Sequence, residues 1–526
     1  MSLFFLEIKD IFNNQTKDND FDLISNHYKD KTFRFKSMDF QPQNNCLLSY
    51  DENGIFDEEK TLDLMADCLY FSWFEEWRQN NYDISRFPIN ISEQDKDDCL
   101  NELQNNNLAK NNINRIGFKN NWKLVLNQIK NHVNINNTLN NIEDFNNIEL
   151  KVFKKMIIDN IKNYIRATFN TPDEYLDEFG KYLEWKKIPL NENYKIFDDK
   201  IDCTNVEQGA LGTCYFLEAI STLSNYGQLL YQLFPNENIK NDGFYEICLF
   251  HKGKWVKVLI DDYFLFYKGT NYFVFTQPIQ KCLYSCFLEK AYAKIKGSFA
   301  NIHGGWEFEA FEALTGFRGE VFKIINQKLE NNLCDYFCRK IKEGFLFACS
   351  VDKHAYSLLS IVEENLDKIF QIRNPWNKLS EKNKESFEQF YNKFHIYKLE
   401  EKTGIFFLDK KIFEEYFEDV TICQILFGTT IYTYKLNNIV PQINKKLYFY
   451  FETFNNSKIS IGLFQQDNQG FYTNYQIKLF DITNNTTVNL RTIGKLKKEL
   501  AKAVGKITYE VYNEIEKSKY LLSVEF

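Results

Sequence analysis

Hydrophobic positions recur at helical spacing in three parts of the chain. Thr61–Trp77 and Leu150–Phe169 predict two long helices within the first 170 residues. A third helix is predicted to begin at Cys214, because apolar residues follow it at the same spacing, namely Phe216, Leu217, Ile220 and Leu223. Residues 101–147 are dense in asparagine, and a loop, a low-complexity insert and capped helices remain equally open there.

Elsewhere the pattern indicates strands. Two segments rich in β-formers, His354–Val362 and Lys368–Trp376, flank a polar stretch and predict a β-hairpin. Positions 354 and 374 are symmetric about residue 364, which falls in the polar stretch, so we expect His354 and Asn374 to lie opposite each other, about 5 Å apart at Cα. After Thr430 short alternating segments predict an antiparallel sandwich. Its expected strands are residues 446–451, 458–462, 475–480 and 520–526.

The segment that begins at Gln208 and ends at Cys214 carries the first candidate chemistry. Two glycines allow a tight turn before the helix, and Cys214 falls in its first turn, where unpaired N–H groups lower a thiol pKa. A buried, inert cysteine is the common alternative. His354 offers a base, and the Asn374 carbonyl can fix its tautomer. Three complementary groups that converge by independent routes favour a catalytic site.

These residues resemble the protease core of the calpain family. The matching segments span about residues 171–425 and are Trp185–Pro189, Gln208–Cys214, Leu288–Lys294, His303–Gly305, Leu314–Gly316, His354–Ser357 and Arg373–Trp376. The resemblance implies an intracellular, papain-like endopeptidase with two lobes. It makes Cys214 the nucleophile, His354 the general base and acid, and Asn374 the orienting residue.

The resemblance also implies supporting roles. Gln208 matches the glutamine of the oxyanion hole, Trp376 the tryptophan that shields the His–Asn hydrogen bond, and Gly305 a cleft glycine that binds substrate. Lys353 stands where the family has a glycine. Beside the histidine, its side chain is expected to change substrate preference or to repel the imidazolium.

Calcium is the main departure from the family. Calpains bind one calcium ion in each protease lobe through acidic loops. Here the corresponding positions are not acidic; they are Asn205 and Cys282 in the first lobe, and Ser380, Thr403 and Ile405 in the second. Calcium needs several oxygen ligands, commonly carboxylates, so we expect no metal site and no cofactor.

Composition narrows the class of protein. The 526 residues carry a formal net charge of −8, which argues against a nucleic-acid partner. No stretch approaches the roughly 20 apolar residues of a membrane span, and the N-terminus lacks a signal-peptide pattern. Twelve cysteines without a framework spacing indicate reduced thiols in the cytoplasm.

The expected fold class is α+β, with four parts. Residues 1–170 form an α-rich N-terminal extension, 171–300 the first lobe of the protease core, 301–428 the second lobe, and 429–526 a β-sandwich. Residues 1–170 are expected to pack against the core; docking a protein partner, or inhibiting the core, is the alternative. The sandwich is a second candidate for a partner.

Two functions of different class remain open. The first is a cysteine endopeptidase that performs limited proteolysis of protein substrates. The second is a scaffold that keeps the calpain fold with little turnover, which Lys353 and the missing calcium carboxylates favour. Acyl transfer of the transglutaminase type is remote, since Asn374 stands where that chemistry uses an aspartate.

Overall fold

The computed structural model describes the chain in segments. These are residues 40, 46–51, 54–79, 94, 148–188, 193–198, 201–235, 243–317, 319–324, 331–351, 353–364, 367–376, 403–425, 446–452, 457–464, 474–481, 495–504, 507–515 and 519–525. The asparagine-rich residues 101–147 and Ser380 lie outside the described residues. The expectations placed on both therefore stay predictions.

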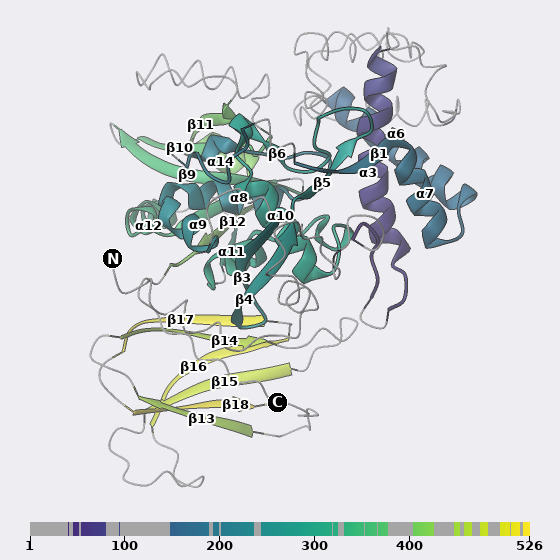
Figure 1. The fold of residues 1–526 in the computed structure, drawn as a ribbon. Coiled ribbons are helices and arrows are strands. Elements are labelled where there is room, and N and C mark those ends of the chain that lie inside the picture. The colour runs from purple at the N-terminus through teal and green to yellow at the C-terminus, as the bar shows by residue number, and fades with distance from the viewer. Residues whose placement is uncertain are drawn as a thin grey trace. The chain divides into compact units, whose positions relative to one another are not determined.

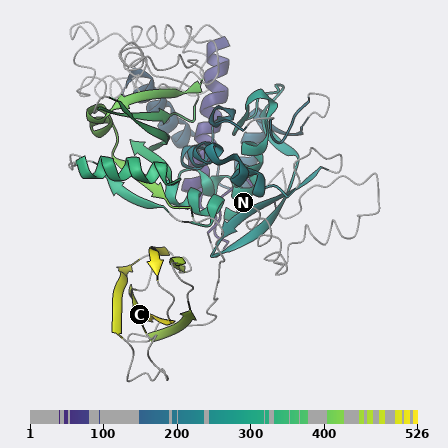
Figure 2. The same cartoon turned by 90° about the vertical axis from the view of Figure 1, so that its left-hand side faces the viewer.

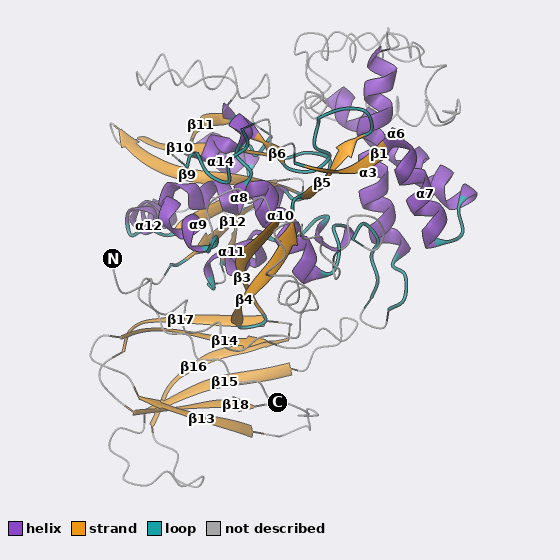
Figure 3. Cartoon of the chain, viewed as in Figure 1, coloured by secondary structure: helices purple, strands orange, loops and turns teal. Residues whose placement is uncertain are grey.

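The described residues belong to two compact units (Figures 1 and 2). One contains those from Phe40 to Leu249 and from Val256 to Ile425, and the other contains Phe250–Trp255 with the strands after Leu426. Both helices and antiparallel sheets are present (Figure 3), as the expected α+β class requires. Among the described helices, none has the combined length and apolarity that crossing a membrane demands. The four-part division at residues 171, 301 and 429 stays a prediction.

The N-terminal part of the first unit is helical. Its helices are α3 (Glu58–Gln79), α6 (Ile148–Thr168) and α7 (Pro172–Tyr182). The first two confirm the predicted helices and lie side by side (Figure 1). They are joined by ion pairs that α6 lysines and an arginine make with acidic residues of α3, namely Lys154–Asp67, Lys162–Asp63 and Arg166–Glu59. Thr171 caps α7 by accepting the Glu174 N–H at 3.4 Å.

Residues 183–317 form short two-stranded sheets and helices. The strands are β1 (Leu183–Lys187), β2 (Val206–Glu207), β3 (Phe244–His251), β4 (Lys254–Asp261), β5 (Tyr263–Tyr267) and β6 (Gln277–Pro278), which pair as β1–β5, β2–β6 and β3–β4. The helices are α8 (Cys214–Leu223), α9 (Gly227–Gln232), α10 (Tyr284–Lys296) and α11 (Glu307–Thr315), with 3₁₀ turns η6 (Cys203–Asn205), η7 (Ser224–Tyr226), η8 (Ile279–Lys281) and η9 (Ala300–Ile302). Every residue of α8 is buried, so the helix that begins at Cys214 is a central element of this unit.

A six-stranded antiparallel sheet follows, in the order β11-β10-β9-β8-β12-β7. Its strands are β7 (Glu320–Lys323), β8 (Leu346–Val351), β9 (His354–Glu364), β10 (Asp367–Arg373), β11 (Ile405–Asp409) and β12 (Asp419–Cys423). Helices α12 (Asn331–Lys342) and α14 (Lys410–Tyr416) pack on it through a shared apolar core. Phe413 of α14 stacks on Phe370 of β10 at 4.0 Å between ring centroids. Burying each such ring contributes about 1.5–3 kcal/mol.

The predicted hairpin is present, but the predicted register is wrong. Asp367 pairs with Glu364 next to the turn, which lies further along the chain than residue 364. The register then shifts between Gln371 and Ile372, and Arg373 pairs with Ser357. A β-bulge bends a strand and re-aims its side chains. His354 and Asn374 are therefore not directly opposite each other, and Asn374 follows the end of β10.

The second unit contains the C-terminal strands (Figure 2). They are β13 (Lys446–Glu452), β14 (Ser457–Phe464), β15 (Asn474–Asp481), β16 (Lys495–Val504), β17 (Ile507–Ile515) and β18 (Lys519–Glu525). One sheet has the order β13-β18-β15-β16, and β14 pairs with β17. The four predicted strands are confirmed, whereas β16 and β17 were not predicted, since alternation is weak in the lysine-rich β16 sequence.

Candidate active site

The loop before Cys214 has no room for a side chain at Gly209 and little at Gly212. A Cβ on Gly209 would lie 2.0 Å from the carbonyl oxygen of Phe275, and one on Gly212 would lie 3.1 Å from the His303 ring. Neither glycine has a positive φ, so the neighbouring atoms are what limit a side chain, namely the Phe275 backbone at Gly209 and the His303 side chain at Gly212. The loop consequently enters α8 with Thr213 as the residue before the helix and Cys214 as its first residue.

A buried carboxyl group fixes the start of α8. Glu289 of α10 accepts hydrogen bonds from the Thr213 hydroxyl and, at 3.0 Å, from the Thr276 N–H. Burial raises the pKa of Glu289, and the bonds from Thr213 and Thr276 oppose that rise. Thr213, the residue before Cys214, thus has a structural partner that no sequence pattern indicated.

Cys214 is 9 % exposed, and its thiol lies against the backbone on both sides of His354. Its Sγ is 4.0 Å from the Lys353 carbonyl oxygen, and the Ala355 N–H donates to it. Burial raises the pKa of the thiol to about 12, although the bond from Ala355 opposes this rise. The position at the helix N-terminus therefore does not produce a thiolate in this arrangement, contrary to the low thiol pKa expected there.

His354 and Asn374 make the expected hydrogen bond. His354 Nε2 lies 3.0 Å from Asn374 Oδ1, and the Trp376 backbone N–H donates to the same oxygen at 3.1 Å. Because that oxygen can only accept, Nε2 carries the proton and Nδ1 is left as the acceptor. The Trp376 ring covers the pair, with its centroid 4.2 Å from that of His354. Burial lowers the pKa of His354 to about 3 despite the Asn374 bond.

Gln208 connects the loop before Cys214 to the segment Pro375–Trp376. Its Oε1 accepts the Trp376 indole N–H at 2.7 Å, and its Nε2 donates to the Leu211 carbonyl at 2.9 Å. Its own backbone N–H donates to the Pro375 carbonyl at 3.1 Å. These partners fix the orientation of the amide, and one Nε2 hydrogen remains beside the loop that precedes Cys214.

Gly305 and Lys353 both occupy special positions. A Cβ on Gly305 would lie 2.4 Å from the Tyr215 ring, so the residue after Cys214 packs directly on this glycine. Lys353 is exposed and has a φ of 66°, in the left-handed region that favours glycine. The backbone at residue 353 therefore keeps a glycine-like shape although the residue is lysine.

The described residues at the positions that match the family's calcium ligands have other surroundings in this structure. The Asn205 Oδ1 accepts the Asp202 N–H at 3.0 Å in a capping box, and its Nδ2 donates to Gln280. Cys282 is fully buried. Thr403 accepts the N–H of Ile405, which is paired in the sheet. In the part of the chain that the structure describes, no three histidine, cysteine or acidic residues are grouped to hold a metal ion.

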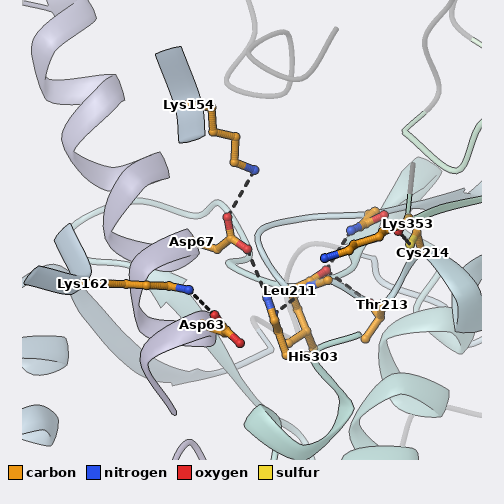
Figure 4. Close-up of polar contacts among 11 residues, drawn as sticks. Asp63, Asp67, Lys154, Lys162, Leu211, Thr213, Cys214, His303 and Lys353 are labelled. Atoms are coloured by element: carbon orange, nitrogen blue, oxygen red, sulfur yellow. Dashed lines mark hydrogen bonds and ion pairs between the residues drawn. The ribbon is translucent and has the colours of Figure 1, made fainter. Parts of the chain in front are cut away.

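Two contacts beside the site were missed by the sequence reasoning (Figure 4). His303 Nδ1 accepts the Gly212 N–H at 3.1 Å, and His303 Nε2 lies 3.2 Å from Asp67 of α3. Burial alone would raise the pKa of Asp67, but Lys154 and His303 outweigh it and lower the pKa to about 2. The segment His303–Gly305 was a sequence signal for this loop, whereas nothing in the sequence pointed to Asp67.

Two further acids are buried next to the site. Glu218 lies one helical turn after Cys214 and is fully buried, as Glu307 nearly is. Burial, reinforced by Glu307, raises the pKa of Glu218 well above its usual range. Within the described residues the Glu218 Oε1 has no hydrogen-bond partner. Burial therefore favours the protonated form of the Glu218 carboxyl group.

Residues 169–424, which contain the candidate site, resemble a known protein family. Residues 169–424 match the family model of the calpain family cysteine proteases. Calpain of Schistosoma mansoni is 32% identical over 237 residues, which is 40% of this chain and 30% of that protein. Calpain-8 of Rattus norvegicus is 31% identical over 200 residues, or 34% of this chain and 28% of the relative. A calpain-type cysteine protease of Oryza sativa subsp. japonica, ADL1, is 27% identical over 320 residues, which is 53% of this chain and 15% of that protein.

The chain thus aligns with less than a third of the length of each of these relatives. The match nevertheless contains the complete candidate site, from Gln208 to Trp376. We conclude that the chain contains a calpain-family cysteine protease domain, which spans residues 169–424.

Proposed function

We propose that this protein is an intracellular cysteine endopeptidase that performs limited proteolysis of protein substrates. The observation that carries the proposal is the hydrogen bond from His354 Nε2 to Asn374 Oδ1 beside the Cys214 thiol. It leaves Nδ1 unprotonated, which is the state that a general base needs. The eleven cysteines among the described residues are free and buried, which suits a reducing compartment.

Cys214, His354 and Asn374 would perform the reaction in two steps. His354 Nδ1 accepts the thiol proton as Cys214 Sγ attacks the peptide carbonyl, and the imidazolium then protonates the leaving amine. Water, activated by His354, hydrolyses the thioester and releases the second product. Asn374 holds the imidazole throughout, and Trp376 shields their bond from water.

The backbone N–H of Cys214 and the remaining Nε2 hydrogen of Gln208 are the proposed oxyanion donors. The loss of one such donor typically costs on the order of 10²–10³ in rate. Gln208→Ala should therefore be severely impaired without being inactive. Gly305 is proposed to bind the substrate backbone, since it has no side chain and packs on Tyr215.

The resting site is proposed to be uncharged. Burial raises the pKa of Cys214 and lowers that of His354, so both groups are neutral at pH 7. A thiolate–imidazolium pair needs solvation or a substrate dipole to form in such a place. Proton transfer would then accompany substrate binding instead of preceding it.

A scaffold with little turnover is the second candidate. The same burial of Cys214 and His354 favours it, because a substrate must reach both groups. The intact His354–Asn374 bond, the shielding Trp376 ring and the oriented Gln208 amide favour the protease. A scaffold has no need for this hydrogen-bond set.

Labelling with an epoxysuccinyl cysteine-protease probe tests the proposal. The full chain is treated with and without calcium, and the labelled residue is identified by mass spectrometry. We expect labelling at Cys214 in both conditions, none in Cys214→Ala, and full labelling in Cys349→Ala, which removes another buried thiol. A folded wild-type protein without label in either condition would support the scaffold instead.

A further inference from the structure

Helix α3 is connected to the loop before Cys214 through one imidazole (Figure 4). His303 Nδ1 accepts the Gly212 N–H at 3.1 Å, and Nε2 donates to Asp67 Oδ2 at 3.2 Å. A backbone amide can only donate and an ionised carboxylate can only accept. Both partners therefore select the neutral imidazole that carries its proton on Nε2.

Gly212 is held on both of its backbone groups. Its N–H donates to His303, and its carbonyl accepts the Gly304 N–H at 2.8 Å. The His303 ring also packs closely on Gly212, since a Cβ there would lie 3.1 Å from it. The turn at residues 303–304 thereby fixes the loop two residues before the nucleophile.

Residues that precede the protease domain hold this turn in place. The Phe299 N–H donates to the Cys46 carbonyl at 2.7 Å, and the Ser49 hydroxyl donates to Asn301 Oδ1. Together with Asp67 they anchor residues 299–303 at three points. The N-terminal part of the chain therefore contacts the turn that positions the nucleophile loop.

Helix α6 supplies the charge that keeps Asp67 ionised. Lys154 Nζ lies 3.2 Å from Asp67, and it also lies over the Tyr70 and Phe71 rings at 5.4 and 5.2 Å. One turn earlier on α3, Asp63 makes a similar ion pair with Lys162. Of Asp63 and Asp67, it is Asp67 that also contacts His303.

We propose that His303 is a positioning residue of the active site, held by Asp67, so that helices α3 and α6 form part of the catalytic apparatus. The pair keeps the Gly209–Thr213 loop in the shape that presents Cys214 and the oxyanion donors. This inference rests on the proposed function for its catalytic consequence. The positioning itself can be measured without any substrate.

Asp67→Ala and Asp63→Ala form a matched pair of variants. Each removes one carboxylate of α3 and one ion pair to α6, but only Asp67→Ala releases His303. We expect the amides of residues 209–213 to exchange with deuterium at least tenfold faster in Asp67→Ala than in wild type. Asp63→Ala should retain wild-type exchange in that peptide.

Enzyme kinetics should also distinguish Asp67→Ala from Asp63→Ala. A small misplacement of a reacting group can cost up to 10²-fold in rate. Asp67→Ala is expected to lose at least tenfold in kcat and in the rate of Cys214 labelling, with KM within about twofold. Asp63→Ala should keep both rates, and thermal unfolding shows whether the two variants are folded alike.

Two variants of His303 complete the test. His303→Asn places an oxygen near the position of Nδ1 and retains an acceptor for the Gly212 N–H, whereas His303→Leu removes it. His303→Asn should retain most of the protection from amide exchange that His303→Leu loses. Equal exchange and rates in Asp67→Ala and Asp63→Ala, or wild-type exchange in His303→Leu, would overturn the proposal. If the exchange differs but no form cleaves peptide or takes label, positioning stands and the proposed protease function fails.

Discussion

Single residues show how environment changes the chemistry expected from position. Cys214 is the first residue of a helix, where a thiolate is favoured, yet burial raises the pKa of its thiol to about 12. Loss of hydration outweighs the partial charge of the helix end, which is worth only about 0.3–1 kcal/mol at exposed sites. Hydrogen bonding behaves as expected, because the acceptor-only Asn374 oxygen selects one tautomer of His354.

Lys353 is the residue with the clearest backbone strain at the site. A non-glycine residue in the left-handed region costs roughly 1–2 kcal/mol, and glycine loses about 0.5–1 kcal/mol through the unfolded state. Lys353→Gly should raise the free energy of unfolding by about 0.5–1 kcal/mol in urea titrations. The reverse change, Gly344→Ala, places an alanine at a φ of 89° and should lower it by about 1 kcal/mol. A loss of stability in Lys353→Gly would contradict this reasoning.

Glu218 should make stability depend on pH. Its pKa is raised in the folded state, so the stability present below the ordinary glutamate pKa of about 4.3 is lost as the pH rises above it. Glu218→Gln removes that loss and should raise the free energy of unfolding by at least about 1 kcal/mol at pH 8, with little effect at pH 4.

Unfolding titrations at both pH values measure the effect of Glu218→Gln. The control is Glu415→Gln, since the Glu415 side chain is 67% exposed and its replacement should change stability by less than about 0.5 kcal/mol. An equal gain in Glu218→Gln at pH 4 and pH 8 would mean that packing, and not ionisation, produces the effect.

At the scale of elements, the entry to α8 depends on close packing of backbone on backbone. Gly209 leaves no room for a side chain, because its Cβ would lie 2.0 Å from a main-chain oxygen that cannot move independently. Gly209→Ala should therefore lower the free energy of unfolding by more than about 2 kcal/mol or prevent folding.

Gly180 provides the contrasting element. It lies in helix α7, and nothing stands within 4 Å of the Cβ that alanine would add. Gly180→Ala should raise the free energy of unfolding by about 0.5–1 kcal/mol, because alanine favours the helix. Urea unfolding of Gly209→Ala and Gly180→Ala tests both expectations. Similar free energies of unfolding in the two variants would refute the steric argument.

For the whole molecule, calcium should have no effect on folding stability. Of the five positions that match the family's calcium ligands, Asn205 is an amide held by hydrogen bonds, Cys282 is buried, and Ile405 is paired in a strand. A bound site with a dissociation constant of about 10 μM would add about 2.7 kcal/mol at 1 mM calcium. We expect the thermal midpoint to change no more with 1 mM calcium than with 1 mM magnesium. A saturable rise specific to calcium would reveal a site at other residues.

The helix that begins at Cys214, the hairpin, the two N-terminal helices and four of the C-terminal strands were all predictable from the sequence. Each of these elements follows from a local feature of the sequence, namely its hydrophobic periodicity, its glycines or its turn residues. The hydrogen bond between His354 and Asn374 was also predictable, although the register was not, because a bulge leaves no trace in the alternation of side chains.

Other features of the site depend on how distant parts of the chain pack together. Burial raised the pKa of the Cys214 thiol, which the sequence had led us to expect to be low, and it raised the pKa of Glu218 beside the site. Asp67 came to His303 from a helix more than 200 residues earlier in the chain. Desolvation and contacts between distant segments depend on what packs around a group, and neighbouring residues in the sequence do not specify that packing.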